Sequence, residues 1–361
     1  MAYTTIDDPS EYFHTQLYTG NGSSGNSITN DANAGDFKPD WLWIKPRSAS
    51  DNHVIFDSSR GSDRQLKIAT DDEDTHSPAR VTFETDGFDL DTTDGNYNGN
   101  GTTYVAWQWI ANGGTRTTFT ESGSNPGGGR QVNTTAGYSI IDYTGTGSNG
   151  TIAHGLGSTP NVVFVKARDT GTNDSWFTHW TGLLNDNQVL YWNSTDAAAT
   201  NASGFNSTAP TSTNITIGTN SASNTDAKKY IMYAFTNIQG YSKIGTYTGN
   251  GNADGTFVYT GFKPAWTMIK NIETDGYNWV IQDTKRFGGI NSGATDKNLA
   301  ANSSSAEPSS GSFAGNQIDY LSNGFKLRST AGNTNAAQKY IYMAFAEHPF
   351  VSSKGVPATA K

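Results

Sequence analysis

Apolar side chains occur in short runs along this chain, separated by stretches rich in Gly, Asn, Ser and Thr. In the run at residues 41–45 both alternating sets of positions contain apolar residues, and the same holds at 162–165. Such runs are typical of central strands that are buried on both faces. The lysine that ends each run is expected to emerge where the strand leaves the sheet. No stretch carries the 3.6-residue apolar period of a helix, so we predict an all-β protein.

Three landmarks recur along the chain at intervals of roughly 105 to 125 residues, which is too long for a solenoid unit. A Tyr-Thr-Gly turn stands at residues 18–20, 143–145 and 247–249. A proline followed by an apolar run that ends in lysine spans residues 39–45, 160–166 and 264–270. A short apolar segment that contains alanine and ends in an aromatic residue closes each copy, at 104–107, 232–235 and 342–345.

These repeats predict three tandem, related β-sandwich modules of the jelly-roll or lectin-like kind, with loops rich in Gly and Asn. Asx-Gly turns at 86–87 and 323–324 support hairpins in the first and third copies. The predicted boundaries are module 1 at 1–112, a Gly-rich linker at 113–136, module 2 at 137–239, module 3 at 240–351 and a C-terminal tail at 352–361.

Composition removes several classes of function. The chain of 361 residues has no cysteine, so disulfides, cysteine-bound zinc and thiol catalysis are excluded. Its 24 Lys and Arg against 33 Asp and Glu give a net charge of −9, which argues against nucleic-acid binding and against a polybasic membrane contact. There is no apolar run long enough to span a bilayer, and the N-terminus does not look like a signal peptide. We expect a protein made in the cytoplasm and not inserted into a membrane.

Several motifs resemble a repeated domain of unknown function that is common in virion structural and tail-fibre-like proteins of marine bacteriophages. They are YTGNG at 18–22 and 247–251, F-K-P-x-W-x-x-I-K at 37–45 and 262–270, DGF at 86–88 and YIYMAFAEHPF at 340–350. The resemblance implies a virion location, other virion proteins as partners and a homo-oligomer, with a trimer favoured. It supplies no agreed catalytic residues.

The second copy is unusually rich in aromatic residues, and this suggests a binding surface. An exposed Trp or Tyr can stack on a sugar or anchor a protein partner. The alternative is ordinary core packing, which aromatic residues in strands serve more often. The candidates for binding a host cell-surface glycan are His179, Trp180, Tyr191 and Trp192.

An acid and an arginine recur three residues apart, as Asp57 with Arg60 and Asp283 with Arg286. A planar guanidinium suits a bidentate pair with a carboxylate. We therefore predict structural ion pairs that fix a loop, with a clamp for a sugar carboxylate as the alternative. The second copy departs from this pattern, because Trp180 stands in place of the aspartate.

A calcium loop is the clearest metal hypothesis. Asp89, Asp91 and Asp94 nearly reproduce the D-x-D-x-D-G spacing that presents oxygens to Ca²⁺, but the third Asp comes one residue late and no bidentate Glu follows. The alternative is a turn whose acids are solvated. No other cofactor is expected.

No catalytic constellation is evident, since the His and Glu residues are scattered and no metalloprotease or phosphate-loop motif occurs. We therefore predict a protein that is not an enzyme. The favoured function is a tail-fibre-like or surface-exposed virion component that binds host glycan or receptor through loops. The alternatives are a capsid or tail decoration protein without receptor binding and, third, a glycan-degrading depolymerase.

Overall fold

The computed structural model describes residues 2–31, 36–68, 73–169, 175–287, 297–308 and 316–357. The regular secondary structure of the described chain consists almost entirely of antiparallel strands, so the predicted all-β fold class is confirmed. The helices are single turns, namely η1 (Pro9–Glu11), α1 (Ser221–Asn224) and α2 (Thr284–Phe287).

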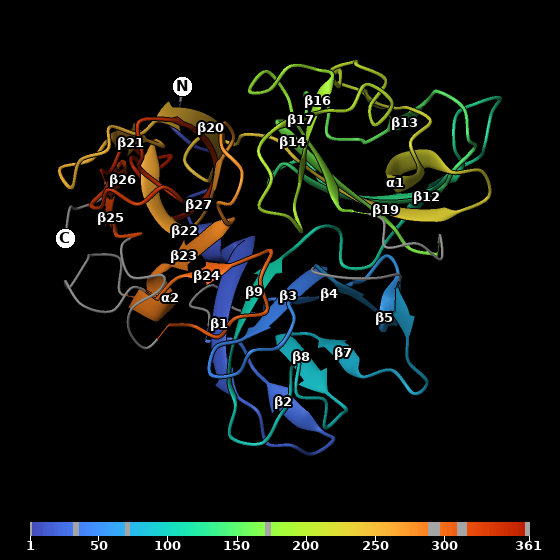
Figure 1. The fold of residues 1–361 in the computed structure, drawn as a ribbon. Coiled ribbons are helices and arrows are strands. Elements are labelled where there is room, and N and C mark those ends of the chain that lie inside the picture. The colour runs from blue at the N-terminus through green and yellow to red at the C-terminus, as the bar shows by residue number, and fades with distance from the viewer. Residues whose placement is uncertain are drawn as a thin grey trace.

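One strand order occurs three times, in three large sheets that we call the large sheets of units 1, 2 and 3 (Figure 1). In unit 1 the order is β1 (Phe13–Thr19), β9 (Thr103–Trp109), β3 (Trp41–Pro46), β4 (Val54–Asp57) and β5 (Gly61–Lys67). In unit 2 it is β12 (Tyr138–Thr144), β19 (Lys229–Phe235), β14 (Val162–Ala167), β15 (Phe177–Trp180) and β16 (Gln188–Tyr191). In unit 3 it is β20 (Ser242–Thr248), β27 (Lys339–Pro349), β22 (Phe262–Asn271), β23 (Val280–Asp283) and β24 (Leu299–Ala300).

Each unit also has a small sheet. Unit 1 contains β2 (Asn26–Ile28), β8 (Gly87–Leu90) and β7 (Val81–Glu84) in that order. Unit 2 contains β13 (Gly150–Ala153) and β18 (Asn214–Ile217). Unit 3 contains β21 (Phe257–Tyr259), β26 (Gly324–Leu327) and β25 (Ile318–Leu321). Short strands extend the large sheets of units 1 and 2, namely β6 (Asp74–Thr75), β10 (Thr117–Phe119), β11 (Gly128–Asn133) and β17 (Ala199–Thr200).

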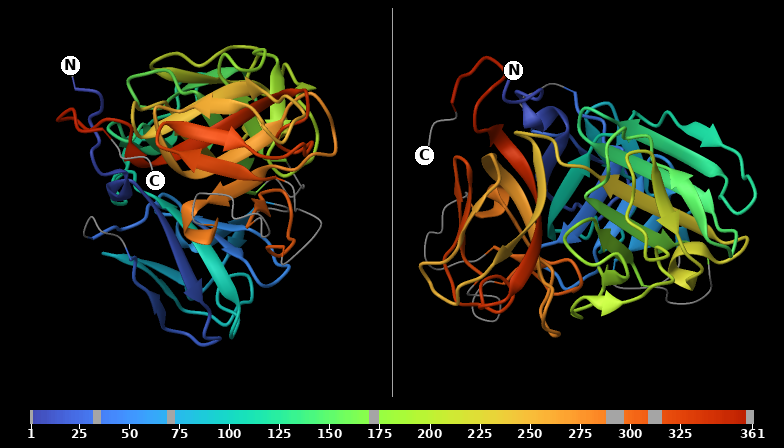
Figure 2. Two further views of the ribbon diagram at one scale, coloured as in Figure 1. Left: turned by 90° about the vertical axis from the view of Figure 1, so that its left-hand side faces the viewer. Right: turned by 90° about the horizontal axis from the view of Figure 1, so that it is seen from above.

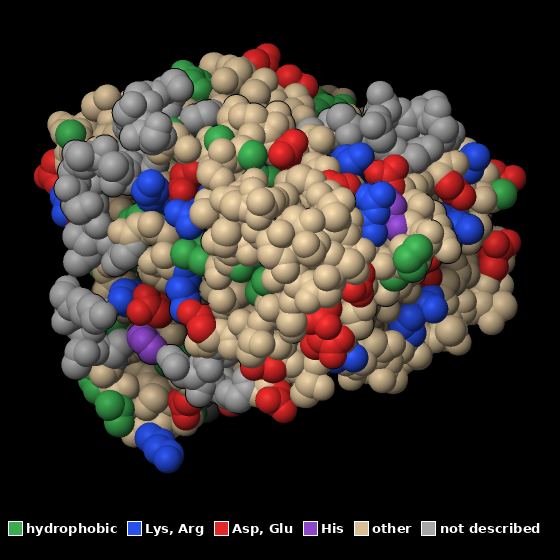
Figure 3. Space-filling view, turned by 90° about the horizontal axis from the view of Figure 1, so that it is seen from below, with side chains coloured by type: hydrophobic (Ala, Val, Ile, Leu, Met, Phe, Trp, Pro, Cys, Tyr) green, Lys and Arg blue, Asp and Glu red, His purple; other side chains and the backbone are tan. Residues whose placement is uncertain are grey.

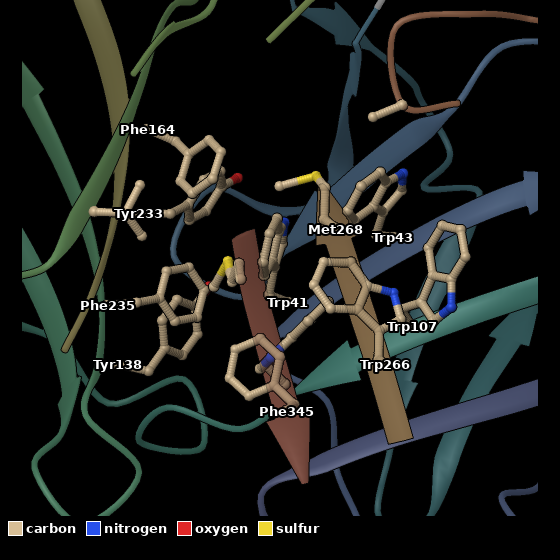
Figure 4. Close-up of a cluster of buried hydrophobic side chains, with 14 of the residues drawn as sticks. Trp41, Trp43, Trp107, Tyr138, Phe164, Tyr233, Phe235, Trp266, Met268 and Phe345 are labelled. Atoms are coloured by element: carbon tan, nitrogen blue, oxygen red, sulfur yellow. The ribbon is translucent and has the colours of Figure 1, made fainter. Parts of the chain in front are cut away.

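The apolar residues form two kinds of core. Between the large and the small sheet of each unit lies an outer core, for example around Phe88 in unit 1 and Phe325 in unit 3. The opposite faces of the three large sheets meet in one central core, to which all three units contribute. Figure 4 shows its aromatic side chains, which come from strands of all three units. The three large sheets are therefore buried on both faces.

Ring contacts in the central core join the units directly. Trp41 of unit 1 packs against Tyr233 of unit 2, with ring centroids 4.7 Å apart. Trp109 of unit 1 packs edge-on to Phe345 of unit 3, at 5.4 Å, and Phe345 also meets Phe235 of unit 2, at 5.8 Å. Buried aromatic pairs of this kind stabilise a fold beyond their area alone. The three units thus surround one common interior and are not separate domains. The two views of Figure 2 show them packed against one another.

The Tyr-Thr-Gly turns have the same structure in all three units. In unit 1, Tyr18 stacks on Tyr104 at 4.9 Å, and the Tyr104 hydroxyl donates to the carbonyl of Gly95. A Cβ on Gly20 would lie 2.3 Å from the carbonyl oxygen of Gly99, so only glycine fits there. The buried Asn98 closes the turn by donating to two carbonyls and accepting from the N–H of Asn21.

The same partners recur in the other units. Asn224 and Asn335 take the place of Asn98, each donating to two loop carbonyls and accepting a backbone N–H from the Tyr-Thr-Gly segment. Tyr230 and Tyr340 likewise donate to loop carbonyls. The recurring turn is therefore a device that fixes the loop before the last strand of each unit.

The predicted linker at 113–136 is wrong in part, because this segment contains β10 and β11, which pair with β12 in the large sheet of unit 2. Its glycines permit close packing: a Cβ on Gly128 would lie 2.0 Å from the carbonyl oxygen of Asp142. The predicted tail also makes contacts, since Val351 and Pro357 form an isolated bridge and the Ser353 N–H donates to Asp7. Residues 358–361 lie outside the described part.

The lysines that end the apolar runs do not emerge into solvent. Lys45, Lys166 and Lys270 are buried, with at most 1% of their surface exposed. Lys45 donates to the carbonyls of Pro46 and of Ser304 in unit 3, and Lys270 donates to Thr195 of unit 2. The expectation failed because the strand ends at Lys45 and Lys270 are covered by a neighbouring unit, which a single-strand pattern does not show.

Candidate binding cleft and the contacts between units

The aromatic candidates of unit 2 lie mainly in the interior. Trp180 and Trp192 are fully buried, and Tyr191 is half-buried. Trp180 stacks on Trp279 of unit 3 at 5.9 Å, while Trp192 meets Trp43 of unit 1 edge-on at 4.9 Å. For both tryptophans the alternative of core packing is therefore the correct one, and the prediction of an exposed sugar-binding surface is wrong. Their number reflects a sheet that must cover two cores, one on each face.

His179 is also fully buried, on the opposite face of β15 from Trp180. Its ring lies 5.2 Å from that of Phe205, and neither ring nitrogen has a hydrogen-bond partner among the described residues. Burial lowers the pKa of His179 to about 4, although Asp186 opposes this. The side chain is neutral at physiological pH and does not reach a surface ligand.

Asp57 and Arg60 form an ion pair, with Nε and Oδ2 2.5 Å apart, and Asp283 and Arg286 do the same. All four side chains are buried. The backbone N–H of each arginine also donates to its aspartate. Each aspartate accepts one further hydrogen bond from another unit: Asp57 from the Tyr233 hydroxyl, at 2.6 Å, and Asp283 from the Trp107 indole, at 3.0 Å. These pairs join units rather than hold a ligand.

A glutamate extends each ion pair across the interface. Between units 1 and 2, Glu73 contacts Arg60 at 2.9 Å and Arg168 at 2.7 Å. Between units 1 and 3, Glu307 contacts Arg286 at 3.3 Å and Arg47 at 2.8 Å. The two arginines lower the pKa of Glu73 against the opposing effect of its burial. Each network thus satisfies its buried charges, as stability requires.

The interface between units 2 and 3 has apolar residues at every one of these positions. Strand register places Trp180 where Asp57 and Asp283 stand, and Met343 where Trp107 and Tyr233 stand. Chain spacing places Leu183 at the arginine position. Ala198 and Ile272 replace the glutamate and the second arginine, and the Ala198 N–H donates to the Ile272 carbonyl as Glu73 does to Arg168. All five lie in or against the central core. The departure at Trp180 is therefore part of a joint replacement.

The three acids of the calcium hypothesis do not converge. Asp89 lies within β8, Asp91 is exposed, and Asp94 pairs with Arg80 at 2.6 Å while accepting from the N–H of Asn96. Among the residues that the structure describes, no group of three or more His, Asp or Glu side chains has the arrangement of a metal site.

A polar cleft of about 540 Å³ lies between units 1 and 3, and the sequence pattern does not single it out. It is formed where β1 and η1 of unit 1 meet β22, β27 and α2 of unit 3. Its apolar lining includes Phe13, Ala265 and Ala346. No sequence motif pointed to it, because its walls come from segments more than 200 residues apart.

The charged groups of the cleft have both signs, and most of them form ion-pair contacts. Lys285 contacts Asp31 at 3.0 Å, and His14 contacts the same carboxylate at 3.1 Å. Lys263 contacts Glu347 at 3.0 Å. Burial lowers the pKa of His14, which disfavours its charged form, although Gln16 and Asp31 oppose this. The remaining charged side chains of the lining are Asp7, Asp8 and His348.

Two polar atoms of this cleft make no hydrogen bond with any described residue, and one of them, Oε2 of Glu347, is ion-paired with Lys263. The hydroxyl of Thr15 is buried and makes no hydrogen bond with any described residue, and Thr15 as a whole is only 5% exposed. An unsatisfied buried hydroxyl costs on the order of 1–3 kcal/mol, and most buried polar groups in proteins have a hydrogen-bond partner. On the face shown in Figure 3, hydrophobic side chains are isolated among polar ones, and charges of both signs are scattered.

Comparison with known proteins gives a family without an assigned function. No curated protein and no solved structure matches this chain. In the described residues no helix has the length and apolar character needed to cross a membrane. A family model matches residues 8–349, nearly the whole chain. The chain therefore belongs to the family described as Domain of unknown function (DUF7483).

Proposed function

We propose that this protein is a structural component of a bacteriophage particle that binds a host-surface saccharide in the cleft between units 1 and 3. The likeness of its motifs to virion proteins supports the particle role. The observation that carries the binding role is the buried, unpartnered Thr15 hydroxyl in a cleft that combines apolar and charged lining. Three units packed around one core are suited to holding the walls of such a cleft in fixed positions.

The paired charges favour an uncharged, hydroxyl-rich ligand. A strongly anionic ligand would compete with Asp31 for Lys285, and a cationic one would compete with Lys263 for Glu347. A sugar hydroxyl can donate to a carboxylate or accept from a lysine while both ion pairs persist. The apolar lining at Phe13, Ala265 and Ala346 matches the C–H face of a sugar ring.

Binding is tested on a printed array of neutral, zwitterionic and uronic-acid-containing oligosaccharides, followed by titration calorimetry with the strongest ligand. We expect neutral saccharides to bind best. Thr15→Val keeps the shape of the side chain but removes the hydroxyl, so it should weaken binding about tenfold, the value of one hydrogen bond. Its melting temperature should stay close to that of the parent.

Thr246→Val is the matched control, because the Thr246 hydroxyl donates to the Tyr340 carbonyl and lies outside the cleft. It should leave saccharide binding unchanged. The proposal fails if no saccharide binds, or if binding does not respond to Thr15→Val. Protein that binds only to particles stripped of it would instead support the decoration function, and release of reducing ends would indicate a depolymerase.

A further inference from the structure

The small sheet of unit 3 has an aromatic edge that the other units lack. Strand β21 lies at one edge of this sheet, near the chain's N-terminus (Figure 1). Its central residue Val258 is buried, but Phe257 and Tyr259 on either side are 43% and 55% exposed. They are two of the three large hydrophobic residues that are exposed in the described part of the chain.

The equivalent strands serve as internal controls. The register places Ile28 of β2 and Ile152 of β13 at the position of Val258, and both are buried. The neighbours that correspond to Phe257 and Tyr259 are Ser27 and Thr29 in unit 1, and Thr151 and Ala153 in unit 2. The fold therefore requires an apolar residue at the centre of this strand but not aromatic residues beside it.

Covering a glycine does not explain the aromatic residues either. The ring of Phe257 lies over Gly324 of the neighbouring strand. Aromatic side chains can protect a strand glycine in this way. Unit 1 has a glycine at the same place, Gly87, with Ser27 in the position of Phe257. Unit 1 thus forms the same sheet with the same glycine and no aromatic cover.

The backbone at this edge is also open. The Leu327 N–H donates to the Thr256 carbonyl, and the Thr260 N–H donates to the Asn323 carbonyl. Because bonding groups alternate along an antiparallel strand, the N–H and C=O groups of Phe257 and Tyr259 point away from β26, toward the edge. Natural proteins usually protect such groups.

The neighbouring groups define the length of this opening. In unit 2 the corresponding N–H, that of Thr151, is capped by the Asn125 side chain at 2.8 Å. In unit 3 the described residues cover the next carbonyl outside the strand, that of Gly261, which accepts from the Tyr3 hydroxyl at 2.7 Å. The same hydroxyl lies 3.3 Å from the Tyr259 hydroxyl, at the end of that side chain. The open part is therefore the short segment from Phe257 to Tyr259.

We propose that this edge pairs with the same edge of a second copy of this chain. The sequence around Val258 reads Thr-Phe-Val-Tyr-Thr over residues 256–260, which is nearly the same in both directions. Antiparallel pairing about Val258 sets Phe257 opposite the partner subunit's Tyr259, and the reverse, with four backbone hydrogen bonds. The result is a two-fold, self-complementary interface that joins two three-stranded sheets into one of six strands.

A second copy fits this edge better than an unrelated partner for two reasons. A two-fold axis through Val258 satisfies all the outward groups of Phe257 and Tyr259 at once, so neither copy retains an open segment. It also forms two cross-strand Phe–Tyr pairs on one face, which are favourable partners in antiparallel sheets. This pairing is independent of the cleft, which is lined by other residues.

The test is sedimentation of the full chain over a range of concentrations. We expect a reversible monomer–dimer equilibrium. The double substitution Phe257→Ser with Tyr259→Thr installs the residues that unit 1 uses, so the fold should be kept while the dissociation constant rises at least tenfold. Thr151→Phe is the matched control: it adds an aromatic residue to an edge whose N–H is already capped, and it should not strengthen association.

Hydrogen exchange of the parent protein gives a second measurement that does not depend on any variant folding. The amide protons of Phe257 and Tyr259 should exchange quickly in dilute solution and slowly at concentrations where the dimer forms. A protein that stays monomeric at millimolar concentration would overturn the proposal. So would an oligomer of any size that persists in the double variant, or exchange at these two amides that is independent of concentration.

Discussion

At the scale of single residues, the structure places polar groups inside where the pattern predicted a surface. Lys45 is the clearest case. It donates to backbone carbonyls of its own unit and of unit 3, and no carboxylate lies within ion-pair distance of it in the described residues. Burial lowers its pKa to about 7 and that of Lys270 to about 8. These lysines act as hydrogen-bond donors between units, and the burial of their positive charge is unfavourable.

The lowered pKa predicts how stability depends on pH. Between about pH 7 and the ordinary lysine range the unfolded chain binds the Lys45 proton and the folded chain does not, so stability rises with pH. Urea unfolding at pH 7, 8 and 9 should show this rise, by at most about 1.4 kcal/mol per pH unit for one lysine. The Lys45→Met variant lacks these hydrogen bonds, so it should be less stable than the parent protein at high pH. Its free energy of unfolding should also rise less steeply with pH. Parallel curves for the two proteins would contradict the assignment.

At the scale of elements, equivalent positions form all three interfaces between units, but the residues at these positions are charged or polar in two interfaces and apolar in the third. Two interfaces use a buried Asp–Arg–Glu–Arg network with a Tyr or Trp donor, and the third uses five apolar residues. None of the three interfaces mixes the charged set with the apolar set. Each partly replaced network would leave a buried charge without a partner, which costs more than either complete form.

This predicts a large effect of removing one member. Glu73→Ala should lower the free energy of unfolding by about 3–5 kcal/mol, because Arg168 would lose its carboxylate partner and face Arg60, which would keep only Asp57. Urea denaturation measures the loss. Glu121→Ala, at an exposed position, is the control and should change stability by less than about 0.5 kcal/mol. If Glu73→Ala lowers the free energy of unfolding as little as Glu121→Ala does, the charges of the network do not stabilise the interface.

Sequence patterns predicted the strands better than the contacts between them. Alternation at residues 41–45 correctly gave a strand that is buried on both faces, because that property belongs to the strand itself. The second core that covers the face of Trp41 includes Tyr233 and Phe235, far along the chain. For Trp180 the sequence left core packing and an exposed surface as alternatives, and it did not indicate the cleft beside Thr15, since both depend on how the units pack.

At the scale of the whole molecule, the central core makes the three units interdependent. Trp180, Trp192 and Tyr233 of unit 2 are buried only because units 1 and 3 cover them. Removing one unit would expose a broad aromatic face on the other two. The repeat in the sequence therefore does not mark pieces that fold alone.

We expect a single cooperative unfolding transition. In scanning calorimetry the calorimetric and van't Hoff enthalpies of the full chain should agree, although the chain is longer than most two-state proteins. A fragment of residues 113–239, which keeps every strand of unit 2, should lack a cooperative transition, because its share of the central core would be exposed to water. Two or three separate transitions in the full chain would show that the units are independent after all.

The contrast between charged and apolar interfaces has a consequence for how such a molecule can change over generations. In a ring of three identical subunits, one codon change alters all three contacts at once. A charged network could therefore be replaced by an apolar one only at all three contacts simultaneously. Three units encoded in tandem remove that restriction. The contact between units 2 and 3 carries its own residues at Trp180, Leu183, Ala198, Ile272 and Met343, which a single gene copy serving every contact could not provide.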